Sequence, residues 1–222
     1  MFTGIIKEIG RIIKIKDKTF DKEIEIQCRK ILKDIDKGDS IAVNGVCLTV
    51  TDTGSKSFSC DASFKTLDNT SLKYLKINDP VNLESSLTAS DKLGGHHVNG
   101  HVDCTAKILK ISKIGSSHII SMELPPGIRD FIVTNGSVAI DGISLTISEV
   151  NNDNFSVVII PYTFENTNLS GKHKGDIVNI EIDMLARYAI NFLKSSRISN
   201  MDSQELKDKI LKEKLKEYGF TE

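Results

Sequence analysis

The chain has 222 residues, a formal net charge of −1, no Trp and 6% aromatic residues. The balanced charge provides no long-range field that would attract nucleic acid or an anionic membrane, and the few aromatic residues leave little surface for stacking single strands. No apolar run approaches the ~20 residues that span a bilayer, and no charged-then-apolar leader is visible, so we expect a cytoplasmic protein.

The first predicted element is the alternating apolar stretch from Met1 to Ile15, which reads as a strand. Gly4 and Gly10 interrupt it, so we expect a bend or a bulge. A second strand is predicted at Glu23 to Cys28, inside a charged segment that runs from Lys16 to Lys37.

A β-hairpin is predicted at Ser40 to Val50, which reads SIAVNGVCLTV. Asn44-Gly45 is a dipeptide that accepts positive φ at both central positions of a tight turn, and β-branched residues flank it. Side chains alternate along a strand, so Cys47 and Thr49 should share a polar face opposite Val46, Leu48 and Val50. Such a face suits a pocket wall as well as it suits a solvated sheet.

Two more segments complete this half of the chain. Ser57 to Ala62 is rich in strand formers, and the following KTLDNT should make a short helical turn capped by its own hydroxyl and amide groups. Val81 to Glu84 gives the last strand. About six short strands are expected, which suits a small closed antiparallel barrel.

The second half repeats the first. Gly38 to Ser86 aligns without a gap on Asn135 to Asp183, with fifteen identities over the 49 positions. The N-terminal stretch aligns on Val98 to Ile111 at an offset of 96 rather than 97, so one inserted residue is expected in a loop. We predict an all-β fold of two tandem homologous six-stranded antiparallel Greek-key barrels, over residues 1–96 and 97–184, followed by a helical tail.

The tail covers residues 185–222 and has no copy in the first half. Leu185, Ala189 and Phe192 fall at helical spacing, and a second helical run starts with a capping box at residues 202–205. Such amphipathic helices could pack on their own chain or join partner chains. We expect oligomerisation.

The most conspicuous candidate for chemistry is LGGHHVNGHVD, Leu93 to Asp103. Its three histidines suggest a metal site, but the glycines disfavour a helix, and on a strand His97 and His101 are only loosely placed for one ion. We therefore favour His101 as an acid or base that lines a pocket, with a structural histidine at the domain boundary as the alternative. The four cysteines show no metal-ligand spacing and are read as free thiols.

Several motifs together resemble riboflavin synthase: MFTGII, NGVCLTV, GGHHVNGHVD, IDGISLTI and VNIEID, in order over about residues 1–190. In that family two molecules of 6,7-dimethyl-8-ribityllumazine dismutate by transfer of a four-carbon unit. The products are riboflavin and 5-amino-6-ribitylaminouracil, in the last step of riboflavin biosynthesis. The resemblance implies a transferase without a metal or a bound cofactor. It also implies a homotrimer joined by C-terminal helices, and it suggests lumazine synthase as a further partner.

The resemblance further implies that each pocket holds the ring and the ribityl chain with backbone and hydroxyl groups. In the first half the matching positions are Gly4, Ile5, Ile6, Cys47, Leu48, Thr49, Asp61, Ala62, Ser63, Phe64, Lys65 and Thr66. In the second half they are Gly100, His101, Val102, Asn135, Ser144, Leu145, Thr146, Ile159, Ile160, Pro161, Tyr162, Thr163 and Phe164.

A reaction between two copies of one substrate needs two similar pockets with different tasks, and a duplicated barrel provides them. We expect His101, Ser144 and Thr146 to move protons at the acidic methyl group of one lumazine. Cys47, with Ser40 and Thr49, would assist the acceptor as nucleophile or hydrogen-bond partner, and Asp183 would orient groups or balance charge. The alternatives are a lumazine-binding antenna that does not convert its ligand, and a flavin-binding barrel of a reductase, which would need a nucleotide-binding domain after it.

Overall fold

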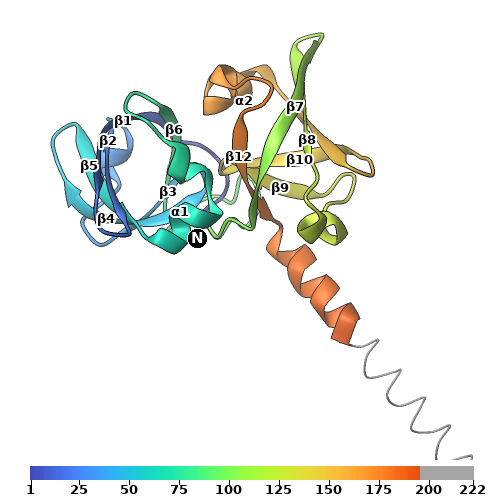
Figure 1. Cartoon of the computed structure of the whole chain (residues 1–222), viewed down its shortest axis with the longest axis horizontal. Helices are drawn as coiled ribbons and strands as arrows, with labels where there is room; N and C mark the ends of the chain where they lie inside the picture. The colour runs from blue at the N-terminus through green and yellow to red at the C-terminus, as the bar shows by residue number, and fades with distance from the viewer. Residues whose placement is uncertain (196–222) are drawn as a thin grey trace, which may run out of the picture. The chain divides into compact units, whose positions relative to one another are not determined.

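A computed structural model describes residues 1–195, which include two closed six-stranded antiparallel β-barrels (Figure 1). The chain forms two compact units, Met1–Met184 and Leu185–Glu222, and both barrels lie in the first unit. The predicted fold class is confirmed.

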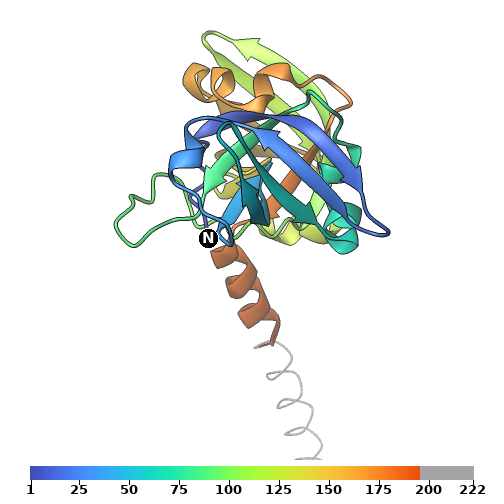
Figure 2. The same ribbon diagram turned by 90° about the vertical axis from the view of Figure 1, so that its left-hand side faces the viewer.

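The first barrel, which faces the viewer in Figure 2, has the closed strand order β1-β2-β5-β4-β3-β6. Because β2 lies beside β5 rather than β3, the four strands β2 to β5 form a Greek key. The strands are β1 (Glu8–Asp17), β2 (Lys22–Gln27), β3 (Ser40–Val43), β4 (Val46–Thr53), β5 (Ser57–Ala62) and β6 (Pro80–Ser85), with short helices η1 (Ile31–Lys33), α1 (Phe64–Asn69) and η2 (Ser71–Tyr74) between them.

The second barrel repeats this order with each strand number raised by six. The duplication read from the sequence is therefore a duplication of topology. The strands are β7 (Cys104–Ile114), β8 (Ser117–Glu123), β9 (Ser137–Ile140), β10 (Ile143–Val150), β11 (Asn154–Ile159) and β12 (Ile177–Ile182), with short helices η3 (Pro126–Phe131), α2 (Pro161–Glu165) and η4 (Asn168–Gly171).

The two predicted hairpin turns have the expected backbone. Asn44 and Gly45 have φ of 46° and 74°, and Asp141 and Gly142 have φ of 44° and 80°. Positive φ at both central positions matches the twist of the flanking strands. After each turn, side chains alternate between the barrel interior and the polar face, as predicted.

Each barrel closes over its own apolar core, in which Phe58 and Phe155 are equivalent large side chains. Burial of a side chain of this size contributes about 1.5–3 kcal/mol. Gly10 is needed on β1 because a Cβ there would lie 2.5 Å from Leu83 Cδ1 inside the barrel.

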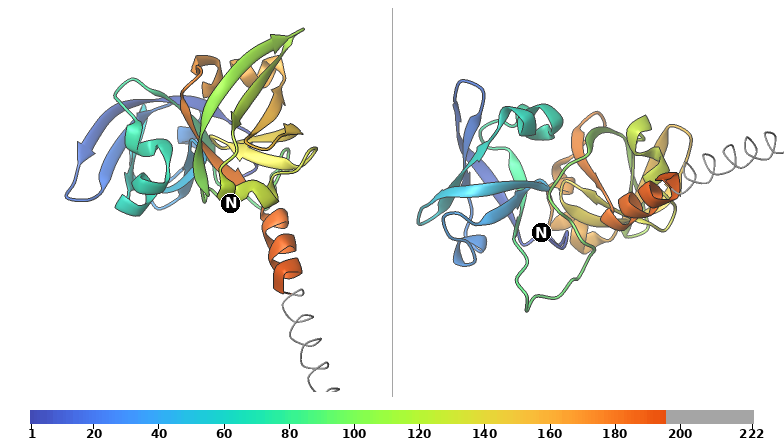
Figure 3. Two further views of the ribbon diagram at one scale, coloured as in Figure 1. Left: turned by 45° about the vertical axis from the view of Figure 1, so that its right-hand side comes forward. Right: turned by 90° about the horizontal axis from the view of Figure 1, so that it is seen from below.

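The predicted strand from Met1 starts late, at Glu8. Residues 1–7 instead run between the barrels, where the fully buried Phe2 donates its N–H to Val98 O at 2.7 Å and accepts from Val98 N at 3.1 Å. The connection between β6 and β7 passes beside this N-terminal segment (Figure 3). Hydrogen bonds to the connection thus replace those of a barrel strand.

The inserted residue lies in a loop, as expected. Ile24 pairs with Cys60, and the equivalent Ile120 pairs with Val157. The offset is therefore 120 − 24 = 96 on β2 and β8 and 157 − 60 = 97 on β5 and β11. The extra residue falls in the loop that carries η1 or η3, before β3 and β9.

The predicted first helix of the tail is present over residues 184–195. Leu185, Tyr188, Phe192 and Leu193 on this helix are all more than half exposed. The second predicted run, with the capping box at residues 202–205, lies outside the described residues. Within residues 1–195 no helix combines the length and apolarity that crossing a bilayer requires.

Candidate functional sites

The N-terminal segment of the first half lies on the second barrel. Ser144 N, at the start of β10, donates to Gly4 O at 2.8 Å. Gly4 has φ of +75°, and a Cβ there would lie 2.6 Å from Ser144 Cβ. Only glycine allows this backbone conformation and this close approach.

The equivalent segment of the second half lies on the first barrel. Cys47 N donates to Gly100 O at 2.8 Å, and a Cβ on Gly100, whose φ is +78°, would lie 2.6 Å from Cys47 Cβ. The grouping of the candidate residues by halves is therefore wrong, because both segments cross to the other barrel before β1 and β7 begin. We define the first site as residues 47–49, 61–66 and 100–102, and the second site as residues 144–146, 159–164 and 4–6.

Strand register brings the other parts of each site together. Val50 pairs with Cys60, so the start of β4 lies beside the end of β5, where α1 begins. Ile147 and Val157 do the same on the second barrel. Each site carries an exposed aromatic side chain, since Phe64 at the first and Tyr162 at the second are 64% and 73% exposed. Each site combines backbone groups, hydroxyls and an exposed aromatic ring.

The histidine that reaches Ser144 is His96, which sequence reasoning missed. Its Nδ1 lies 2.7 Å from Ser144 Oγ, and its buried Nε2 has no hydrogen-bond partner in the structure. Burial lowers the pKa of His96, and the charge of Asp183 opposes this shift only in part. A neutral imidazole therefore faces the Ser144 hydroxyl and can accept its proton. The signal was present in the GGHH sequence, since Gly95 allows the connection to approach Ser144 closely.

The expected grouping of His101 with Ser144 and Thr146 does not form within the chain. His101 follows Gly100 on the segment that contacts Cys47, so it belongs to the first site, and its side chain is exposed. Ser144 and Thr146 lie on β10 in the second site. The first site therefore has the Cys47 thiol where the second site has a serine hydroxyl bonded to a histidine.

The remaining candidates lie around the two sites. Ser40 pairs with Thr49 across the β3–β4 ladder at the first site. Asn135 has φ of 66° and donates its N–H to Ile147 O at 2.8 Å on the second barrel. Asp61 accepts from Lys18 Nζ at 2.8 Å.

All four cysteines are free thiols. Burial raises the pKa of Cys28 and Cys60 to about 12 and that of Cys104 to about 11, which keeps these three protonated near neutral pH. In the part of the chain that the structure describes, no group of three His, Cys, Asp or Glu side chains is placed to hold a metal ion.

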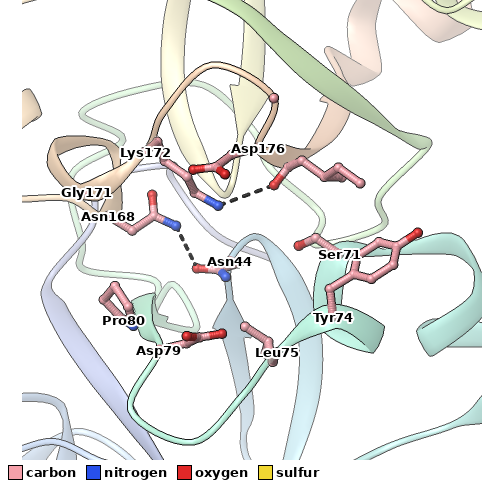
Figure 4. Close-up of a pocket in the computed structure, with 12 residues that line it drawn as sticks. Asn44, Ser71, Tyr74, Leu75, Asp79, Pro80, Asn168, Gly171, Lys172 and Asp176 are labelled. Atoms are coloured by element: carbon pink, nitrogen blue, oxygen red, sulfur yellow. Dashed lines mark hydrogen bonds between the residues drawn. The ribbon is translucent and has the colours of Figure 1, made fainter.

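A cavity of about 400 Å³ opens between the barrels, away from the two sites (Figure 4). None of the residues expected at a site lines it. Asn44 and Asn168 line the cavity and belong to a buried amide network. In this network Asn82 N donates to Asn44 Oδ1 at 2.8 Å, and Asn179 N donates to Asp141 Oδ1 at 2.8 Å. The side-chain amides of the two asparagines donate to turn carbonyls of the other barrel. Asn82 Nδ2 donates to Asp141 O at 3.0 Å, and Asn179 Nδ2 donates to Asn44 O at 2.8 Å.

One ion pair breaks the symmetry of this network. Lys172 Nζ lies 3.3 Å from Asp141 Oδ2, and Asn168 Nδ2 donates to the same oxygen at 2.9 Å. The first half has Asn44 and Leu75 at the positions of Asp141 and Lys172. The network therefore joins two unlike barrels through hydrogen bonds that cross between them.

Comparison with known proteins agrees with this architecture. The sequence matches the family described as Lumazine binding domain twice, over residues 3–86 and 99–183. It is 41% identical over 220 residues to a riboflavin synthase of Actinobacillus pleuropneumoniae, covering 99% of this chain and 100% of the relative. The chain belongs to the riboflavin synthase family. A riboflavin synthase of Bacillus subtilis (strain 168) is 40% identical over 220 residues, with the same coverage.

Solved structures show the same fold. LumP complexed with 6,7-dimethyl-8-(1'-D-ribityl) lumazine has a TM-score of 0.75 at 26% identity and covers 82% of this chain and 98% of that chain. LumP complexed with riboflavin has a TM-score of 0.77, also at 26% identity, and covers 82% of this chain and 99% of that chain.

Proposed function

We propose that the chain is a riboflavin synthase that converts two molecules of 6,7-dimethyl-8-ribityllumazine into riboflavin and 5-amino-6-ribitylaminouracil. The observation that carries the proposal is the pair of equivalent sites, one on each barrel, in a chain about 40% identical over its full length to riboflavin synthases. Two like sites suit two like molecules. Fixing two reactants in the right geometry removes several kcal/mol of their encounter entropy from the barrier.

The difference between the sites divides the work between donor and acceptor. At the second site, Ser144 and the neutral His96 would remove a proton from the acidic methyl group of one lumazine, with Asp183 stabilising the imidazolium that forms. At the first site, the Cys47 thiol would meet the other lumazine as a hydrogen-bond partner or nucleophile, beside Ser40 and Thr49. His96 thus takes the proton-transfer role that the sequence suggested for His101.

His101 keeps a place in the proposal as a ligand contact at the first site. Its neighbour Gly100 is held against Cys47 by a backbone hydrogen bond, so the imidazole stands at the rim of that site. The other residues of the two sites would hold the ring and the ribityl chain through backbone groups, hydroxyls and the exposed rings of Phe64 and Tyr162.

The experiment is to mix the purified protein with ribityllumazine and record absorption spectra over time. A synthase produces a growing flavin absorbance and releases the pyrimidine product. A spectral shift of bound lumazine without flavin formation would overturn the proposal and indicate an antenna protein.

We also propose that the exposed helix face of residues 184–195 joins chains into a homotrimer. Exposure of four large apolar side chains on one helix to water is unfavourable, and contact with partner chains would bury them. Deletion of residues 185–222 is expected to reduce the mass measured by light scattering to that of one chain. An intact chain that is already monomeric would contradict the trimer.

The remaining parts of the proposal rest on the family resemblance and the sequence pattern. The chain would divide into a first barrel over residues 1–96, a second barrel over residues 97–184 and a tail over residues 185–222. The protein would be cytoplasmic and would have lumazine synthase as a partner. Co-sedimentation of the two purified proteins tests the partner, and a lack of co-migration would remove it.

A further inference from the structure

A buried glutamate on the first barrel holds the segment that crosses to the second site. Glu84, on β6, is 2% exposed. Its Oε1 accepts from Thr3 N at 2.7 Å and from Thr3 Oγ1 at 2.6 Å, and its Oε2 accepts from Gly4 N at 3.0 Å. Both carboxylate oxygens are therefore occupied by donors of the segment whose next carbonyl, Gly4 O, accepts from Ser144 N.

The equivalent glutamate on the second barrel holds the other crossing segment. Glu181, on β12, is 4% exposed, and its two oxygens accept from Asn99 N at 2.7 Å and from Gly100 N at 2.9 Å. Gly100 O then accepts from Cys47 N in the first site. Glu84 and Glu181 are one of the fifteen identical pairs in the alignment of the two halves.

We infer that Glu84 and Glu181 are positioning residues that act across the barrels. Glu84 on the first barrel sets the second site, and Glu181 on the second barrel sets the first site. Neither carboxylate needs to touch the substrate, because each acts through a glycine backbone that forms one wall of a site. The inference deepens the proposed function, since it assigns the control of each site to the opposite half of the chain.

The chemistry requires a carboxylate at both positions. A carboxylate accepts on two oxygens, whereas a glutamine has one oxygen and would turn its NH₂ group toward a backbone N–H. Burial raises the pKa of both glutamates, and the backbone donors oppose this shift by favouring the charged form. Loss of one charge-assisted hydrogen bond should raise the equilibrium constant for opening of the crossing segment by about 10- to 100-fold.

Cys47 gives a local probe of the first site. It is half-buried, as is Cys104, and Cys28 and Cys60 are buried. Burial raises the pKa of Cys28, Cys60 and Cys104, which slows the labelling of these three thiols. In the full-length chain, iodoacetamide labelling followed by peptide mass spectrometry measures its reactivity. We expect Glu181→Gln to raise the Cys47 labelling rate by at least about tenfold. The matched variant Glu84→Gln should leave that rate within about twofold of the unmodified chain.

The reciprocal experiment probes the second site. In a Ser144→Cys background, Glu84→Gln should raise labelling at position 144 by about tenfold, and Glu181→Gln should leave it unchanged. Cys28, a buried thiol that follows β2 on the first barrel, serves as an internal control in both experiments. Glu84→Asp and Glu181→Asp, which retain the charge but shorten the reach, should give the same crossed pattern and replace any glutamine variant that fails to fold.

Equal acceleration at both sites by either variant, or no acceleration, would overturn the inference and leave the glutamates as general stabilisers. Labelling does not depend on turnover. If the chain forms no flavin from lumazine but shows the crossed pattern, the proposed function fails and the inference stands.

Discussion

The ion pair between Asp141 and Lys172 should be a strongly coupled pair at the barrel interface. Asp141 is fully buried and accepts from Asn179 N at 2.8 Å through Oδ1, while Oδ2 meets Asn168 Nδ2 and Lys172 Nζ at 2.9 and 3.3 Å. In Asp141→Asn the side-chain oxygen can still accept from Asn179 N, as Asn44 Oδ1 accepts from Asn82 N in the first barrel. The new NH₂ group then faces two donors, Asn168 Nδ2 and Lys172 Nζ. We expect a loss of roughly 3 kcal/mol in the free energy of unfolding, which corresponds to about 6–12 °C in Tm.

A double-mutant cycle separates coupling from general damage. Lys172→Leu alone should cost about 1.5–3 kcal/mol, since it leaves a buried carboxylate with fewer partners. Asp141→Asn combined with Lys172→Leu recreates the Asn44 and Leu75 pair of the first half, so it should lose at least about 1 kcal/mol less than the sum of the single variants. Urea unfolding followed by circular dichroism gives all four free energies. Strict additivity would refute the view that these side chains act as one unit.

Two further predictions concern the sites. The pKa of His96 lies below its ordinary value of 6.5, so its neutral form and the stability linked to it are present above pH 6.5 and lost as the pH falls through the folded-state pKa. Turnover should therefore decline on the acid side of pH 6.5, and His96→Gln should remove that limb and lower kcat by about 10²-fold, whereas an unchanged limb would exclude His96 as the base. Gly100→Ala should lower Tm and lumazine affinity more than Gly115→Ala, because both positions have positive φ but only the Gly100 Cβ meets another residue within 4 Å. Equal effects of the two variants in calorimetry and ligand titration would show that the close contact between Gly100 and Cys47 contributes to neither stability nor affinity.

Periodicity and local backbone chemistry determined most of the fold. Strand alternation and the turns at Asn44-Gly45 and Asp141-Gly142 depend on neighbouring residues, so local patterns predict them. The repeat at a fixed offset is visible when the sequence is aligned on itself. The same local rules gave the wrong start for β1. Residues 1–4 have a strand pattern, but their hydrogen bonds go to the connection between the barrels, to Glu84 and to Ser144. No local pattern records partners so distant along the chain.

The resemblance predicts candidate site residues, but it does not predict which of them lie together in the structure. The resemblance predicts that the segments containing Gly4 and Gly100 are part of the sites, and chain order assigns each segment to the barrel that follows it. The structure exchanges them, because Glu84 and Glu181 hold each segment where its glycine meets the strand of the opposite barrel.

The histidine partner was decided in the same way. The stretch from Leu93 to Asp103 predicted His101 as the imidazole of a pocket, whereas the structure places His96 beside Ser144. Chain order cannot tell which imidazole reaches Ser144, since the contact joins residues 48 positions apart. The sequence by itself determined two copies of one barrel and the kinds of side chain available to each site. Only tertiary structure decided which half completes which site, because that choice depends on hydrogen bonds between segments that are distant along the chain.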